Sequence, residues 1–160
     1  MASRAEGDGA PAAVDVRGDG GILKTIRRAG EGEPLPLGAD VAVHYVGRLE
    51  DGKQFDSSRE RGRPLNFTLG AREVVLGWDL GVATMRVGER AELRLKPEYA
   101  YGSSGAGAAV PPDATLLFDV ELLGRAKQGF PPLATILGMA LFGLLLMYLS
   151  SGLGMKDFRR

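Results

Sequence analysis

A run without charged side chains is the feature that most constrains this 160-residue chain. Between Lys127 and Lys156 lie 28 residues that include no Asp, Glu, Lys or Arg. A helix from Leu133 to Met155 would be about 35 Å long, and a hydrocarbon core is about 30 Å thick. The alternative is a buried core helix, but such helices normally carry a polar stripe, and this run has none. The run therefore predicts a transmembrane helix at 133–154, preceded by a linker at 125–132 and followed by a basic tail at 155–160.

The N-terminal residues carry no targeting signal that we recognise. Residues 1–21 have no apolar core of signal-peptide length, and they contain two Arg against four acidic residues. Their Gly, Ala and Asp content predicts a disordered lead. With the apolar run near the other end, we expect a tail-anchored membrane protein whose folded domain stays in the cytosol. The basic tail suits the endoplasmic reticulum, the mitochondrial outer membrane or a plastid envelope, or the plasma membrane of a bacterium.

The composition excludes several classes of site. The chain has no Cys and one histidine, His44, so thiolate zinc sites, iron–sulfur clusters and multi-histidine metal sites are not expected. A net charge of +0 gives no long-range attraction to nucleic acid. GAGAAV at 105–110 approximates a dinucleotide-binding loop, but Pro111-Pro112 follows where a helix should begin. We therefore expect no metal, cofactor or nucleic acid, and a structural, hydrogen-bonded role for His44.

The segment between the two ends, residues 22–124, alternates apolar runs with turn signals. Asp51-Gly52 is typical of a hairpin turn. A short helix is expected at 74–85, with Trp78 and Val82 on its apolar face. We therefore expect an α+β domain in which an antiparallel sheet packs on one helix. The expected strands are 22–26, 41–50, 65–69, 91–96 and 115–123.

Long strings of this segment resemble the FKBP family, the macrolide-binding peptidyl-prolyl isomerases. The similarity runs in order through residues 22–124 and is carried by HYVGRLEDGKQFDSSRERGRPLNFTLG (44–70), EVVLGWDLGVATMRVGER (73–90), PEYAYG (97–102) and VPPDATLLFDVELL (110–123). The resemblance implies a twisted antiparallel sheet curled around one short helix, with a pocket between them. It also implies an enzyme that accelerates rotation of X-Pro bonds without a cofactor or a metal.

The resemblance implies roles for individual residues. Trp78 would lie under the proline ring, and Arg61 would orient Asp56 and Tyr101. Glu73 would offer a backbone carbonyl at the rim, and the backbone of Val75 would supply a polar contact. The implied catalytic set is Tyr45, Phe55, Asp56, Trp78, Tyr101 and Phe118. The residues expected to contact a proline substrate or a macrolide are Arg61, Leu65, Phe67, Glu73, Val74, Val75, Ala106, Ala109 and Val110.

Three of these positions depart from the family pattern. Leu65 stands where a phenylalanine is common, Ala106 where a histidine or similarly large residue is frequent, and Ala109 where a larger aliphatic residue is usual. Each change removes apolar surface, worth ~25 cal/mol per Å² buried, so we expect catalysis with reduced affinity for FK506-like or rapamycin-like macrolides. The expected partners are proline-containing protein clients and, through residues 133–154, the lipid bilayer. The alternative is a weakly active or inactive adaptor or chaperone module tethered to the membrane.

Overall fold

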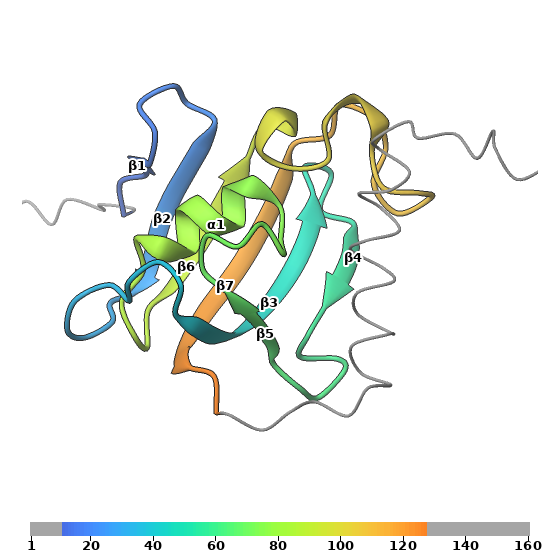
Figure 1. The fold of residues 1–160 in the computed structure, drawn as a ribbon. Coiled ribbons are helices and arrows are strands. Elements are labelled where there is room, and N and C mark those ends of the chain that lie inside the picture. Colours follow the sequence, from blue (N-terminus) through green and yellow to red (C-terminus); the bar gives the residue numbers. More distant parts are fainter. Residues whose placement is uncertain (1–10, 128–160) are drawn as a thin grey trace, which may run out of the picture.

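Antiparallel strand pairing organises the part of the chain that the structure describes. The computed structural model describes residues 11–127, which form a seven-stranded sheet and one α-helix (Figure 1). The strand order is β1-β2-β6-β7-β3-β4, and β5 shares the outer edge of β3 with β4. The elements are β1 (Val14–Asp15), β2 (Ile22–Arg28), β3 (Asp40–Leu49), β4 (Gln54–Ser57), β5 (Leu65–Thr68), α1 (Leu76–Ala83), β6 (Arg90–Leu95) and β7 (Leu116–Arg125), with short 3₁₀ turns at Pro97–Tyr99 and Gly102–Ser104.

This architecture confirms the expected antiparallel sheet with one short helix. The bounds of all five expected strands lie within two residues of β2, β3, β5, β6 and β7. The pattern did not predict β4, because only Phe55 among its four residues is a large apolar residue. Its strand conformation comes from pairing with β3, which a local pattern cannot show.

The central pair of strands carries much of the core. Alternate residues of β7 point to opposite faces of the sheet, so Leu116, Phe118, Val120 and Leu122 are buried. β3 pairs with β7 along almost its whole length. The register places Gly47 opposite Phe118.

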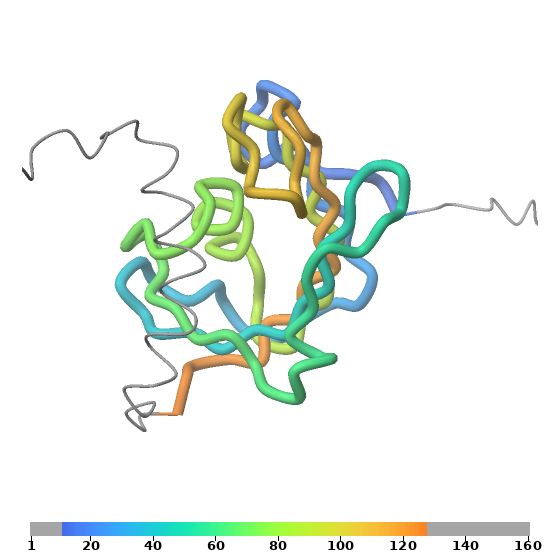
Figure 2. The backbone as a smooth tube through the Cα atoms, turned by 90° about the vertical axis from the view of Figure 1, so that its right-hand side faces the viewer, coloured from blue at the N-terminus to red at the C-terminus, as the bar shows by residue number. Residues whose placement is uncertain are grey.

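The helix lies on one face of this sheet, as the two views show (Figures 1 and 2). Gly77 and Gly81 allow it to approach β6 closely, since a Cβ on Gly77 would lie 2.5 Å from Leu95 and one on Gly81 would lie 3.0 Å from Leu93. α1 is shorter than the expected 74–85 helix, because Val75 has an extended backbone (φ −57°, ψ 146°). Trp78 and Val82 are buried, as the helical spacing predicted.

The first residues of the described segment differ from the expected disordered lead. β1 pairs with β2, with Val14 opposite Lys24. The Asp15 carboxylate accepts hydrogen bonds from the backbone N–H groups of Arg17, Gly18 and Gly20. The composition of residues 1–21 suggested disorder, but a short acidic side chain among glycines also stabilises a tight loop. The expected disorder is therefore wrong for residues 14–20.

The predicted transmembrane helix at 133–154, most of the linker and the basic tail lie outside the described residues. Within residues 11–127, no helix is long and apolar enough to cross a membrane.

A buried ion pair fixes the end of α1 to the sheet. The Lys24 Nζ lies 3.0 Å from the Glu89 Oε1 and 3.2 Å from the carbonyl oxygen of Thr84, which follows the helix. The other Glu89 oxygen accepts the backbone N–H of Arg86 at 3.0 Å. Lys24 is 6% exposed and Glu89 is 2% exposed, so water cannot replace either partner.

We predict that Lys24→Met destabilises the domain by about 3–5 kcal/mol, because it leaves a buried carboxylate without its counter-charge. Urea unfolding of a 1–127 fragment, followed by Trp78 fluorescence, measures the change. The control is Arg27→Ala, which removes the exposed Arg27–Glu92 pair and should cost at most about 1 kcal/mol. Equal losses in the two variants would contradict this account.

Candidate functional site

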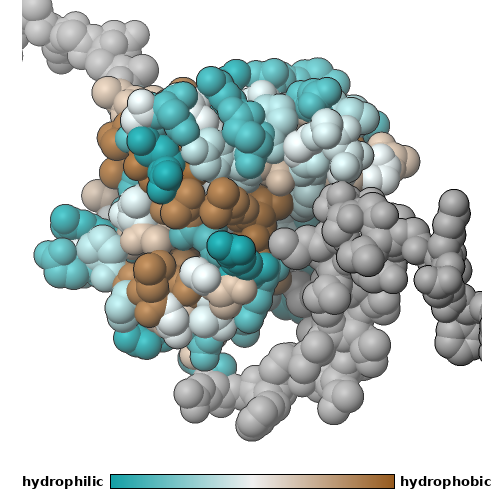
Figure 3. All heavy atoms as spheres, turned by 45° about the horizontal axis from the view of Figure 1, so that its top comes forward, coloured by the Kyte–Doolittle hydropathy of each residue, from teal (hydrophilic) through white to brown (hydrophobic). Residues whose placement is uncertain are grey.

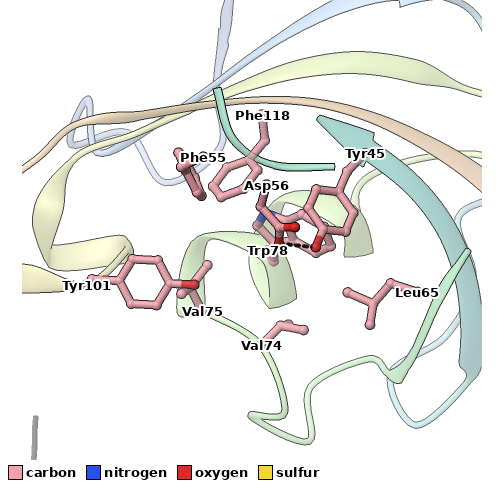
Figure 4. A pocket seen from close by; sticks show the side chains of 9 residues that line it. All are labelled: Tyr45, Phe55, Asp56, Leu65, Val74, Val75, Trp78, Tyr101 and Phe118. Atoms are coloured by element: carbon pink, nitrogen blue, oxygen red, sulfur yellow. Dashed lines mark hydrogen bonds between the residues drawn. The ribbon is translucent and has the colours of Figure 1, made fainter. Parts of the chain in front are cut away.

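An open pocket lies between α1 and the sheet. Its lining comes from β3, β4, β5, β7, α1, the segment before α1 and the turn after β6. The face turned forward in Figure 3 carries apolar side chains gathered within a largely polar surface. The residues that line the pocket are Tyr45, Phe55, Asp56, Leu65, Val74, Val75, Trp78, Tyr101 and Phe118 (Figure 4).

Trp78 is held at the centre of this group by aromatic packing. Its ring meets Tyr45 edge-to-face at a centroid distance of 4.8 Å and Phe118 at 5.2 Å. Phe67 packs against it at 5.9 Å. The indole Nε1 is buried and has no hydrogen-bond partner among the described residues. The orientation of the indole ring therefore depends on ring packing.

A polar group closes one side of the pocket. The Tyr45 hydroxyl donates a short hydrogen bond to Asp56 Oδ2 (Figure 4). Arg61 donates from Nη2 to the Tyr45 oxygen at 2.8 Å and from Nη1 to Asp56 Oδ1. The backbone N–H of Ser57 also donates to Asp56, at 2.8 Å. Both carboxylate oxygens of Asp56 are therefore held in place.

Ser58 supports this group from behind. Its fully buried hydroxyl accepts the backbone N–H of Tyr45 at 2.8 Å and donates to the Tyr45 carbonyl. It also lies 2.9 Å from Nδ1 of His44. His44 is hydrogen-bonded, as expected.

A second carboxylate shapes the segment that leads into α1. The two oxygens of buried Asp79 accept the backbone N–H groups of Gly70 and Arg72, each at 3.0 Å. Arg72 has a positive φ of 59°, a conformation that is costly for a residue with a Cβ. These bonds stabilise the turn and so position Val74 and Val75, which follow it.

The comparisons with known proteins agree with this geometry. Residues 32–123, more than half of the chain, match the family description "FKBP-type peptidyl-prolyl cis-trans isomerase". The chain belongs to the FKBP family of peptidyl-prolyl cis-trans isomerases. It is 52% identical over 103 residues to "FK506-binding protein 1" of Dictyostelium discoideum, with 64% of this chain and 96% of that protein covered.

Other relatives are similar in the same region. "FK506-binding protein 59" of Drosophila melanogaster is 48% identical over 120 residues, which are 74% of this chain but only 27% of that protein. The crystal structure of AtFKBP13 has a TM-score of 0.64 at 41% identity, covering 68% of this chain and 95% of that one. The N-terminal domain of FKBP42 from Arabidopsis thaliana has a TM-score of 0.67 at 27% identity, covering 79% and 98%.

An FKBP-type isomerase needs a pocket more than it needs reactive groups. Rotation of a peptide bond is opposed by a barrier of about 18–20 kcal/mol that comes from amide resonance, and no bond is broken or formed. Within residues 11–127, no group of three His, Cys, Asp or Glu side chains could hold a metal ion.

The structure brings together nine of the residues that the sequence singled out. Six others do not line the pocket. Arg61 donates hydrogen bonds to Asp56 and Tyr45. Phe67 packs against Trp78, and the Glu73 carboxylate accepts the Thr68 N–H at 3.0 Å. The six are Arg61, Phe67, Glu73, Ala106, Ala109 and Val110.

Two expectations about individual residues differ from the structure. Arg61 contacts the hydroxyl of Tyr45 and not that of Tyr101, since Tyr45 is the tyrosine that shares Asp56 with it. Ala106, expected at the rim, is 5% exposed. Its backbone forms two hydrogen bonds with Val110, at 2.7 and 3.1 Å, which close the loop between the two residues.

The environment of the pocket keeps its hydroxyls protonated. Burial raises the pKa of Tyr45, and the hydrogen bond to Asp56 raises it further, against the opposing effect of Arg61. Burial and the nearby charge of Asp56 also raise the pKa of Tyr101. Burial lowers the pKa of Arg61, but hydrogen bonds to Asp56 and Tyr45 outweigh it.

These shifts predict how stability depends on pH. In the unfolded chain Tyr45 loses its proton near its ordinary pKa of about 10, whereas the folded protein retains it. The free energy of unfolding therefore falls as pH rises above about 10. Tyr45→Phe should cost about 1 kcal/mol at pH 8 through its lost hydrogen bonds, and the difference from the wild type should shrink toward pH 11. Urea unfolding at several pH values tests this, and a constant difference would contradict it.

Proposed function

We propose that this isomerase binds the proline of an X-Pro bond against Trp78 and acts on protein clients at the surface of a membrane. The observation that supports the binding mode is the ring cluster in which Tyr45 and Phe118 meet Trp78 edge-to-face. Phe55 lies beyond Phe118 at a centroid distance of 5.6 Å. A proline ring is apolar and compact, and it fits a pocket with these walls.

The reaction follows from what such a pocket does to an amide. In the twisted transition state the amide loses resonance and much of its charge separation. A dry, aromatic site therefore stabilises the twisted form more than the planar, hydrated one. Catalysis in this proposal is differential binding, and no residue acts as a nucleophile.

Two polar groups remain available to the substrate. The Tyr101 hydroxyl lines the pocket and makes no hydrogen bond with the other described residues. The backbone N–H of Val75, just before the first turn of α1, likewise has no acceptor among them. We assign these two donors to the carbonyl groups of the substrate. Asp56, with both oxygens engaged, shapes the wall beside them.

The same pocket is proposed to bind FK506-like macrolides with reduced affinity. The names of the relatives from Dictyostelium and Drosophila describe FK506-binding proteins. Leu65 contributes to the lining here, and it offers less apolar area than the aromatic side chain that is common at this position. The buried side chain of Ala106 adds nothing to the rim.

We predict that a 1–127 fragment accelerates isomerisation of X-Pro peptides. The Dictyostelium relative consists of little more than the matched region, which supports independent folding of such a fragment. Trp78→Ala should lower kcat/KM at least about tenfold, because it removes the surface that the proline contacts. Tyr101→Phe, which preserves the ring, should lower it less. Arg27→Ala, on the outer face of the sheet, should leave it unchanged.

Circular dichroism of each variant separates loss of the pocket from loss of the fold. Full activity in a folded Trp78→Ala protein would refute the binding mode. No acceleration by the folded wild-type fragment would favour the adaptor alternative, in which the pocket holds a partner without turnover.

The proposed membrane context rests on the charge-free run between Lys127 and Lys156. We predict that the full chain resists carbonate extraction from membranes, whereas the 1–127 fragment is released. The Asn66-Phe67-Thr68 sequon tests the orientation, because Asn66 is exposed on β5. A cytosolic domain carries no glycan there, and a glycosidase-sensitive mass shift would reverse the proposed topology.

A further inference from the structure

The loop that follows β1 is held by its own hydrogen bonds. The backbone N–H of Val16 donates to the Ile22 carbonyl at 2.9 Å, where β2 begins. Both oxygens of Asp15 accept backbone N–H groups from within the loop. The loop lies outside residues 32–123, which match the family description. That match therefore says nothing about what the loop does.

This loop contacts the 3₁₀ turn that follows β6, and both lie at the same end of the sheet (Figure 1). Asp19 Oδ2 accepts a short hydrogen bond from the Tyr99 hydroxyl, and its Oδ1 accepts the backbone N–H of Gly21 at 2.9 Å. The chain at Gly21 lies against the Tyr99 ring, since a Cβ there would overlap Cε2 of that ring. The Gly21 carbonyl also accepts the backbone N–H of Lys96 at 2.9 Å, just before the turn. The loop therefore fixes Tyr99 through both its side chain and its backbone.

Tyr101, two residues after Tyr99, depends on this turn for its position. Its hydroxyl lines the pocket and has no hydrogen-bond partner among the described residues (Figure 4). No polar contact of its own therefore orients this side chain, and the backbone that carries it does. In that backbone the N–H of Ala100 donates to the Pro97 carbonyl at 2.9 Å, and the N–H of Gly105 donates to the Tyr101 carbonyl at 3.1 Å.

We propose that Asp19 is a positioning residue of the isomerase, which acts through Tyr99 to place the hydroxyl of Tyr101 at the substrate. Only one residue separates the two tyrosines, so a shift of the Tyr99 ring moves the backbone that carries the hydroxyl. The proposal rests on the proposed role of Tyr101 as a donor to a substrate carbonyl. It adds to the site a residue that lies outside the pocket and contacts no substrate.

The test measures kcat/KM of the full-length chain with an X-Pro peptide. Asp19→Ala should lower kcat/KM about threefold, because even a small misplacement of a positioned group slows a reaction. The loss should not exceed that of Tyr101→Phe, which removes the hydroxyl itself. Asp19→Asn should retain activity, since its oxygen still accepts the Gly21 N–H and its amide nitrogen donates to the Tyr99 oxygen. Glu92→Ala, the matched control, removes a carboxylate from another exposed contact and should leave kcat/KM unchanged.

A double-mutant cycle separates positioning from a general loosening of the domain. In a Tyr101→Phe background, Asp19→Ala should lower kcat/KM no further, since the hydroxyl that it places is absent. A purely structural contact would cost the same factor in both backgrounds. Tyr99→Phe, which removes the other partner of the bond, should cost as much as Asp19→Ala, and the two losses should not add. Equal factors in both backgrounds, or full activity of a folded Asp19→Ala protein, would overturn the proposal.

Hydrogen exchange gives a readout that is independent of turnover. Asp19→Ala should increase exchange of the backbone N–H groups of Tyr99, Ala100 and Gly105, and leave the N–H groups that pair β3 with β7 unchanged. Unchanged exchange in the turn would refute the contact as the cause.

The same variants distinguish this proposal from those on which it rests. Full activity of Tyr101→Phe would refute the donor role of Tyr101, and the positioning role of Asp19 with it. A wild type that binds the peptide without turning it over would refute the proposed enzymatic function. Trp78 is the only tryptophan of the chain, so quenching of its fluorescence gives peptide affinities. The double-mutant cycle measured as affinity would then still decide the role of Asp19.

Discussion

The edge-to-face packing of Trp78 with Tyr45 and Phe118 is the interaction on which the site depends. It joins the helix to both central strands, since the three residues come from α1, β3 and β7. Gly77 and Gly81 let α1 lie close to β6, which brings the Trp78 indole close to the sheet. The Lys24–Glu89 pair fixes the C-terminal end of the helix. The site therefore inherits its shape from the packing of the whole sheet against one helix.

The polar part of the site is organised differently. Asp56, Tyr45 and Arg61 satisfy one another at the wall, while Asp79 binds the backbone of the turn before α1. Each carboxylate satisfies buried or half-buried donors, which would otherwise be costly to desolvate. The Tyr101 hydroxyl and the Val75 N–H, by contrast, have no acceptor among the described residues. They are therefore free to bind a substrate, whereas the engaged groups maintain the structure.

The sequence predicted the elements whose signals are local. Alternation predicts the strands and helical spacing predicts the apolar face around Trp78 and Val82. The resemblance to the FKBP family singles out all nine residues that line the pocket. What it missed depends on neighbours distant in the chain. β4 exists through pairing with β3, and the partner of Arg61 is decided by which tyrosine reaches Asp56. The role of Asp79 follows from contacts with distant backbone N–H groups that no spacing reveals. The loop at Asp15 was missed for a different reason, because a glycine-rich composition fits both disorder and a tight turn.

The short helix has a consequence for how the domain is assembled. α1 has eight residues, too few to be stable alone in water, and it needs the finished sheet to persist. The aromatic pocket joins residues as distant as Tyr45 and Phe118. Among the described strands β7 is the last in the sequence, and it occupies a central position in the sheet. Such non-local topologies fold slowly, because the entropy of loop closure is lost before the stabilising contacts form. While β7 is still inside the ribosome, Phe118 cannot pack against Trp78 and the pocket cannot form. The isomerase pocket is therefore completed only late in the folding of the domain.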